Sequence, residues 1–87
     1  MNTVKGTVYN VGEIITFDSG FTKREFVIET DDQYPQKIKL ELLKDATALI
    51  DESMLGEKVT ASFDLQGREY DGKFYTNVKC WKIEKHD

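Results

Sequence analysis

The sequence predicts an all-β domain, a small five-stranded barrel with one short helix between the third and fourth strands. Three observations support this: long runs of alternating apolar and polar residues, glycines that interrupt or end those runs, and one central segment with helical spacing. Alternation with a period of two buries one face of a strand and exposes the other. The chain has 87 residues, the size of one domain, so we expect residues 1–87 to form a single unit.

The first three strands are predicted at residues 3–17, 21–30 and 37–42. The first is long and contains Gly6 and Gly12. A glycine inside a strand commonly marks a bulge or a sharp bend of the sheet. A long strand that bends in this way can belong to both halves of a closed sheet.

The central segment, residues 45–53, breaks the alternation and is predicted to form the short helix. Asp45 stands where an N-cap residue is expected, and Gly56 stands where a C-terminal glycine is expected. Alternation then resumes in residues 57–65 and 74–84, which we expect to form the fourth and fifth strands.

The same alternation predicts which apolar side chains form the core. It assigns Phe17, Phe26 and Phe63 to the interior and points Leu65, at the end of the fourth strand, inward. Phe21 has two interpretations, because beside a turn it could either stack on a ligand or close the end of the barrel.

The orientation of the fifth strand is left open by its sequence. If Val78 and Cys80 point inward, then Tyr75 and Trp81 point outward. The opposite orientation would bury Trp81 and Ile83, and a large indole in a small domain is more often buried than exposed.

A hairpin loop is predicted at residues 67–73, between the last two strands. It ends in Asp71-Gly72, a pair that readily adopts the positive φ angles of a tight reversal. The same loop carries Arg68, Tyr70 and Lys73, so it presents cationic and aromatic side chains together.

Three strands, a short helix and two further strands form the order of elements in the OB-fold, a five-stranded Greek-key barrel. The usual ligands of this fold are oligonucleotides and oligosaccharides. Closure also removes exposed strand edges, which is an advantage for a small β-protein.

Two stretches resemble bacterial single-stranded DNA-binding proteins: residues 55–63, LGEKVTASF, and residues 67–78, GREYDGKFYTNV. This resemblance implies binding of single-stranded DNA, with Tyr34 as the nearest match to an aromatic that stacks on bases at the start of the third strand. The polar loop at residues 31–36 is shorter than the flexible second hairpin of that family. The whole chain also resembles a small family of uncharacterised, OB-like bacterial proteins, chiefly at residues 17–28 and 34–38.

The net charge of −4 is concentrated in one part of the chain. Residues 45–64 contain five acidic side chains and one basic side chain, whereas residues 65–87 contain four acidic and five basic ones. Local potential rather than total charge attracts a phosphate backbone, because salt screens each charge within about 8–10 Å. We therefore expect a neutral to basic binding face away from the acidic segment.

A groove for single-stranded nucleic acid needs cations for phosphates and aromatic faces for bases. We expect the phosphates to meet Lys23, Arg24, Lys37, Lys39, Arg68, Lys73 and Lys79, and the bases to stack on Tyr34, Tyr70 and Tyr75. Some of these residues also have a purely structural explanation. Tyr70 could merely cover the open end of the barrel, and alternating lysines such as Lys37 and Lys39 often only protect a strand edge from pairing.

Neither catalysis nor a cofactor is expected. His86, the only histidine, lies at the end of the chain, and no cysteine–histidine cluster or phosphate-binding glycine loop is found. Cys80 is the only cysteine and is expected to act as a small apolar core residue. We expect neither a metal site nor an enzyme.

The lone cysteine, and the lack of a signal-peptide pattern or a long apolar run, predict a cytoplasmic protein that does not enter a membrane. The expected function is binding of single-stranded DNA, or RNA, without reading its sequence, by a homodimer or higher homo-oligomer paired through the first strand. One alternative is a protein–protein interaction module without nucleic-acid binding. A second is oligosaccharide binding, which would use the aromatic side chains but not the lysines.

Overall fold

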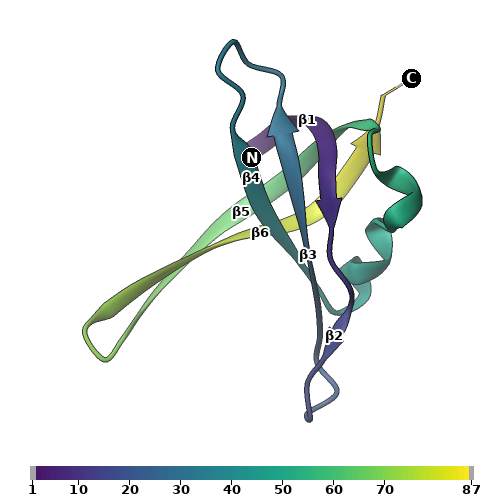
Figure 1. The fold of residues 1–87 in the computed structure, drawn as a ribbon. Coiled ribbons are helices and arrows are strands. Elements are labelled where there is room, and N and C mark those ends of the chain that lie inside the picture. Colours follow the sequence, from purple (N-terminus) through teal and green to yellow (C-terminus); the bar gives the residue numbers. More distant parts are fainter. Residues whose placement is uncertain (1, 87) are drawn as a thin grey trace.

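The strands of the protein wrap into a closed sheet from which one hairpin projects (Figure 1). The computed structural model describes residues 2–86. The strands are β1 (Asn2–Val11), β2 (Ile15–Thr16), β3 (Thr22–Thr30), β4 (Lys37–Leu43), β5 (Lys58–Tyr70) and β6 (Lys73–Lys85), with two 3-10 helices, η1 (Lys44–Leu49) and η2 (Glu52–Met54), between β4 and β5.

The sheet has the order β1-β5-β6-β4-β3-β2, and an additional β1–β3 pairing closes it into a barrel. The β4–β6 contact is parallel and consists of one register pair, Glu41 opposite Lys79, whereas the other pairings are antiparallel. The two-residue β2 only extends the hairpin that leads into β3. The predicted all-β, five-stranded Greek-key barrel is therefore confirmed.

The first strand bends so that it serves both halves of the barrel. It pairs with β5 through Asn2–Thr7 and with β3 through Gly6–Val11, and Tyr9 forms a bulge in the β3 pairing. Gly6 lies where the two pairings overlap. A Cβ atom built on Gly6 would lie 2.1 Å from the Glu29 carbonyl oxygen, so only glycine allows β1 to approach β3 so closely.

The core consists of inward side chains of all five long strands, of one residue that follows η1 and of one residue in η2: Val8, Phe26, Ile28, Leu40, Leu42, Ile50, Met54, Val59, Ala61 and Cys80. The orientation of β6 follows from a second bulge, at the register shift beside Ser62 and Phe63. Cys80 is buried and Trp81 is 42% exposed. Trp81 is the extra residue of this bulge and has no partner on β5, so the alternation is shifted by one residue beyond it. Ile83 therefore also packs against the core, opposite Ala61.

Two predicted core residues are exposed. Phe17 is 45% exposed because it begins the turn before β3, where its N–H donates to the Phe21 carbonyl. Leu65 is 61% exposed because β5 has left the barrel at that point and no element covers it. Phe26 is fully buried as predicted, and Phe63 packs against the core from a half-buried position.

The predicted helix at residues 45–53 is two short 3-10 helices instead. Leu43, not Asp45, occupies the N-cap of η1 and makes no side-chain cap, whereas the Asp51 carboxylate caps η2 by accepting from the Ser53 N–H at 2.9 Å. The Ser53 hydroxyl also donates to this carboxylate, and the hydrogen bonds from the hydroxyl and the N–H together lower the pKa of the Asp51 carboxyl. Gly56 has a φ of +84°, as expected of a residue that ends a helical segment.

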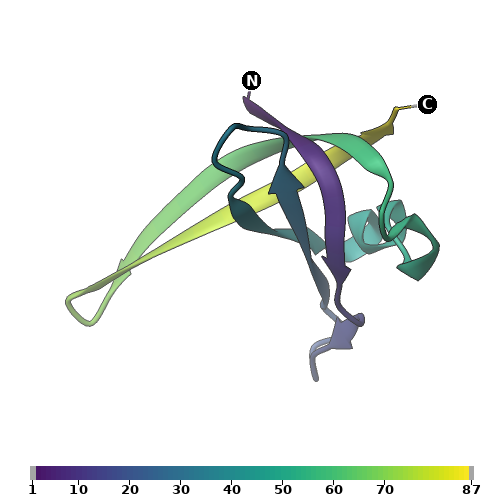
Figure 2. The same ribbon diagram turned by 45° about the horizontal axis from the view of Figure 1, so that its top comes forward.

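The predicted loop at residues 67–73 is also mostly strand. The β5–β6 pairing continues to Tyr70 opposite Lys73, and only Asp71 and Gly72 form the turn, with φ angles of 53° and 78°. Both angles are positive, as in the type I′ turn that suits a two-residue hairpin. β1 pairs with β5 only as far as Phe63, and β4 pairs with β6 only at Lys79, so residues 64–79 form a two-stranded arm that projects from the barrel (Figure 2). The base of the arm still contacts the barrel, because Lys79 pairs with Glu41 and Val78 packs against the core.

The close approach at Gly6 predicts a large loss of stability in Gly6→Ala. The methyl group would collide with backbone atoms of β3, so we expect the free energy of unfolding to fall by about 3 kcal/mol or more, measured by urea denaturation. Gly67→Ala is the matched control, because the nearest atom to its added Cβ is 3.9 Å away. Equal stabilities of the two variants would contradict this account of β1.

The Cys80 thiol is predicted to be unreactive in the folded protein. Burial raises its pKa from 9.0 to about 11, and its Sγ donates to the Lys82 carbonyl at 3.5 Å. A disulfide reagent at pH 8 should therefore modify Cys80 quickly only after denaturation in urea. Because the unfolded thiol ionises first, the free energy of unfolding should decrease as the pH rises from 9.0 toward about 11. Fast labelling of the folded protein would refute this.

Candidate nucleic-acid interface

Most of the predicted site residues share one outward face. Directly paired residues of neighbouring strands point to the same side of a sheet, and the register pairs Arg68 with Tyr75 and Tyr70 with Lys73 on the arm. Lys79 continues this face to Glu41 of β4, which is paired with Glu25 of β3. The outer face, as we call it, therefore carries Lys23, Lys37, Lys39, Arg68, Tyr70, Lys73, Tyr75 and Lys79.

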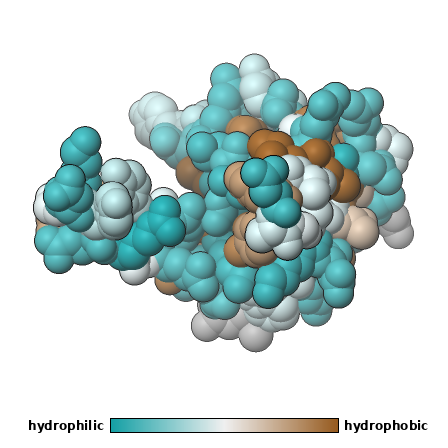
Figure 3. Space-filling model, turned by 90° about the horizontal axis from the view of Figure 1, so that it is seen from below, coloured by the Kyte–Doolittle hydropathy of each residue, from teal (hydrophilic) through white to brown (hydrophobic). Residues whose placement is uncertain are grey.

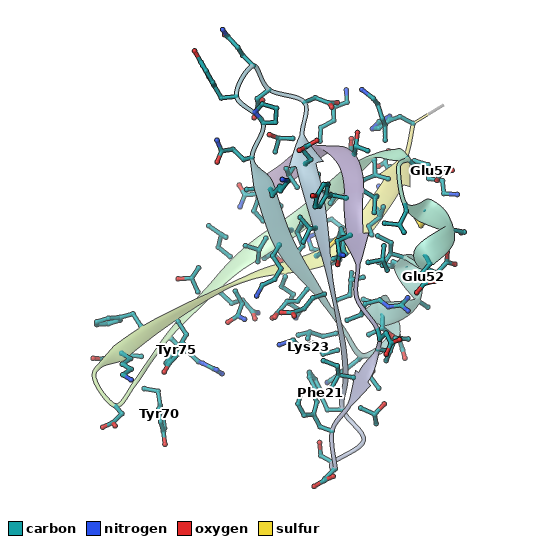
Figure 4. All side chains as sticks on the ribbon, in the orientation of Figure 1. Phe21, Lys23, Glu52, Glu57, Tyr70 and Tyr75 are labelled. Carbon is teal, nitrogen blue, oxygen red and sulfur yellow. The ribbon has the colours of Figure 1, made fainter. Side chains whose placement is uncertain are left out.

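A groove lies between the turn that precedes β3 and the base of the arm. This hairpin groove has a volume of about 530 Å³ and is lined by Phe17, Phe21, Lys23, Glu41, Arg68 and Asn77, among others. The rings of Phe17 and Phe21 lie 6.0 Å apart at an angle of 39° and form one aromatic wall. In Figure 4, Phe21 and Lys23 mark the barrel side of this region, and Tyr70 and Tyr75 mark the arm.

The arm displays its cations and rings without acidic partners. The Arg68 guanidinium lies 5.5 Å from the centre of the Tyr75 ring, and Tyr70 is 72% exposed. Within residues 2–86, Arg68, Lys73 and Lys79 form no ion pair. Figure 3 shows the arm standing apart from the barrel, so a ligand can reach it from several sides.

The barrel part of the outer face is electrically balanced instead. Lys23 Nζ lies 3.6 Å from Glu41 Oε2 and 3.8 Å from Glu25 Oε2, and Lys39 Nζ lies 3.4 Å from Glu25 Oε2. Asn77 Nδ2 also donates to Glu41 Oε2 at 3.2 Å. The expected separation of charge is therefore incomplete, because carboxylates are interleaved with these lysines.

Part of the acidic segment does lie away from the arm. Figure 4 shows Glu52 and Glu57 at the side of the barrel that carries the 3-10 helices, with Tyr70 and Tyr75 at the opposite side. Glu57 is also paired with Lys85 at 3.2 Å. Asp64 is the exception, because the register sets it opposite Lys79 on the outer face.

Arg24 and Tyr34 do not join the other predicted site residues. Arg24 lies on the same side of β3 as the buried Phe26, opposite to the outer face. Its Nη1 donates to the carbonyls of Thr47 (3.4 Å) and Ile50, so the side chain links η1 to the barrel. Tyr34 is exposed in the loop between β3 and β4, at the end of these strands away from the hairpin groove. At that end Lys37 Nζ lies 4.5 Å from the centre of the Tyr9 ring.

Sequence reasoning missed the aromatic wall and the polar floor of the hairpin groove. Alternation predicts Phe17 in the core, although the Asp18-Ser19-Gly20 turn beside it signals a hairpin tip that has no strand to cover it. The sequence places Asn77 on the same outward stripe as Tyr75 but indicates no ligand role for Gln66 or Asn77. The strand register identifies them, because Gln66 and Asn77 are paired with each other and lie on the same face as Arg68 and Tyr75.

Both edges of β1 are occupied over part of its length, by β5 and by β3. The longer unpaired edges within residues 2–86 belong to the arm. Homo-oligomerisation through the first strand stays a prediction, and the arm offers a longer free edge for pairing with another chain.

Within residues 2–86 no three His, Cys, Asp or Glu side chains are grouped to hold a metal ion. In the same part of the chain, no helix is long and apolar enough to cross a membrane.

The chain matches one family over nearly its whole length. The profile described as "Domain of unknown function (DUF3127)" covers residues 3–84. No curated protein matches the chain, single-stranded DNA-binding proteins included, so the likeness to that class remains a hypothesis. The expected membership in a small family without an assigned function fits the match, and the protein belongs to the DUF3127 family.

Proposed function

We propose that this protein binds single-stranded DNA, or RNA, through the hairpin groove and the outer face of the arm, without requiring a particular sequence. The observation that carries the proposal is the exposed Arg68–Tyr75 pair beside a groove with an aromatic wall. In such a pair the cation can contact the phosphate of a nucleotide and the ring can stack on its base. The proposal includes no catalytic step and no cofactor.

Stacking would supply the base contacts. An aromatic side chain that stacks on a base of a single strand is worth about 1–3 kcal/mol, and every base has a flat face to offer. Tyr70 and Tyr75 lie on the arm, and Phe17 and Phe21 lie across the groove, so successive bases could be held from both sides.

The charges favour phosphate contacts chiefly on the arm. Lys23 and Lys39 are already compensated by Glu25 and Glu41. Arg68, Lys73 and Lys79 form no ion pair in the described chain, although Glu41 and Asp64 lie opposite Lys79 in the strand register. Three phosphate contacts would give the logarithm of the binding constant a slope of about −2 against the logarithm of salt concentration. The net charge of −4 works against binding, so we expect a modest affinity.

A second candidate is a protein-interaction module, and the other side of the arm favours it. Leu65 and Phe74 lie on the face opposite Arg68 and Tyr75, and Phe74 is 78% exposed. Exposed apolar side chains beside free strand edges are typical of a surface that pairs with another chain.

The two faces of the arm allow a matched test. Tryptophan and tyrosine fluorescence would be titrated with oligothymidylate of about 15 nucleotides, near the upper site size of one OB barrel, at two salt concentrations. We expect salt-sensitive quenching. Arg68→Ala and Tyr75→Ala should each weaken binding by about 1–3 kcal/mol because each removes a cation or a stacking surface. Phe74→Ala, on the opposite face, should leave the affinity unchanged.

No fluorescence change at low salt would rule out nucleic-acid binding. Binding that is lost in Phe74→Ala and kept in Arg68→Ala would move the site to the other face of the arm and favour the interaction module.

A further inference from the structure

The floor of the hairpin groove holds a nearly buried carboxylate. Glu41 is only 8% exposed, yet it lines the groove between Lys23 and Asn77. Lys23 Nζ and Asn77 Nδ2 both contact the same oxygen, Oε2, at 3.6 Å and 3.2 Å. Within residues 2–86 the second oxygen, Oε1, accepts no hydrogen bond. A carboxylate can accept at both oxygens, so Glu41 keeps an acceptor for a ligand.

This carboxylate decides which part of a nucleotide enters the groove. A fixed negative charge repels phosphates at close range, and because Glu41 is nearly buried, water screens this repulsion less than it would at the surface. The phosphates would therefore lie nearer to Arg68, a cation of the groove lining that forms no ion pair within residues 2–86. A base is the part that can approach Glu41, because bases are uncharged and carry N–H donors.

The floor also offers a donor beside the acceptor. The Lys23 ammonium lies more than 3.5 Å from each of its carboxylate partners, Glu25 and Glu41, so its N–H groups can still donate to a ligand. The Asn77 amide donates through Nδ2 and keeps its carbonyl oxygen as a second acceptor. The groove thus presents an ammonium donor beside two acceptors.

Among the four DNA bases, guanine fits this arrangement best. Its O6 accepts, and its adjacent N1–H and N2 amino group both donate, whereas thymine offers a single imide donor and adenine and cytosine offer a single amino group each. Single-stranded bases present these edges to proteins directly, and lysine contacting guanine O6 is a common specific contact. Phe17 and Phe21 would provide the surface on which the purine stacks. The groove volume, about 530 Å³, lies within the usual range of ligand pockets, about 300–1,000 Å³.

We propose that the hairpin groove selects a guanine at one position of the bound single strand, with Glu41 accepting from the base and Lys23 donating to O6. The inference rests on the proposed function, to which it adds one sequence-specific position. The remaining nucleotides would lie along the arm and be bound without regard to sequence.

The test compares oligonucleotides that differ at one base. The wild-type protein would be titrated with oligothymidylate of about 15 nucleotides and with three versions that carry a single guanine, inosine or adenine at the centre. One guanine per strand avoids structures formed by guanine runs. We expect guanine to tighten binding about 5- to 150-fold, inosine less because it lacks the N2 amino group, and adenine not at all.

Glu41→Gln tests the residue that carries the preference. The amide keeps the shape but removes the charge and places a donor in the groove, so the preference for guanine should disappear while oligothymidylate binds at least as tightly. Glu29→Gln is the control, since Glu29 lies on the outer face opposite Lys37 and should keep the preference. Thermal unfolding of both variants checks that they are folded, and the inosine comparison tests the same contact in the unaltered protein.

Each outcome is decisive. If guanine and thymine strands bind within about twofold of each other while binding is salt-sensitive, the guanine site is refuted and the proposed function stands. If no strand binds at low salt, both are refuted. If the preference is present and survives Glu41→Gln, the assignment to this groove floor is wrong.

Discussion

The structure depends on one continuous pairing, in which β5 and β6 stay paired from Val59 opposite Lys85 to Tyr70 opposite Lys73. One half of this hairpin completes the barrel, and the other half extends beyond it as the arm. An isolated two-stranded hairpin is barely stable in water. The arm avoids this limit because its strands are extensions of barrel strands and because Asp71-Gly72 adopts the positive φ angles of the turn. The bulge at Trp81 lets both Cys80 and Ile83 contact the core while Tyr75 remains on the outer face.

The outer face combines two chemical environments. Where it covers the barrel, Lys23 and Lys39 alternate with Glu25 and Glu41, and the charges nearly cancel. On the arm the cations have no such partners, and Arg68 lies over the Tyr75 ring. The hairpin groove lies at the boundary, with its aromatic wall on one side and the arm on the other. A single strand that follows this path would meet base-binding groups in the groove and phosphate-binding groups on the arm, which is the basis of the proposed function and of the guanine site.

Alternation of apolar and polar residues predicted the strands, the OB-fold and core residues such as Phe26, because burying one face of a strand requires that pattern. The same pattern cannot reveal whether another element covers a face, which is why Phe17 and Leu65 were assigned to the core. The inward orientation of Arg24 could have been deduced, since it shares the parity of Phe26. The pairing of Lys23 with Glu41 could not, because it depends on the register between β3 and β4.

The most direct test of the account is to map the binding face by backbone NMR while oligothymidylate is added at low salt. We predict that amide shifts concentrate at Phe21, Lys23, Arg68 and Tyr75, which surround the groove and the inner part of the arm. Shifts confined to the neighbourhood of Leu65 and Phe74, to η2, or to no residue at all would contradict a nucleic-acid interface on the outer face.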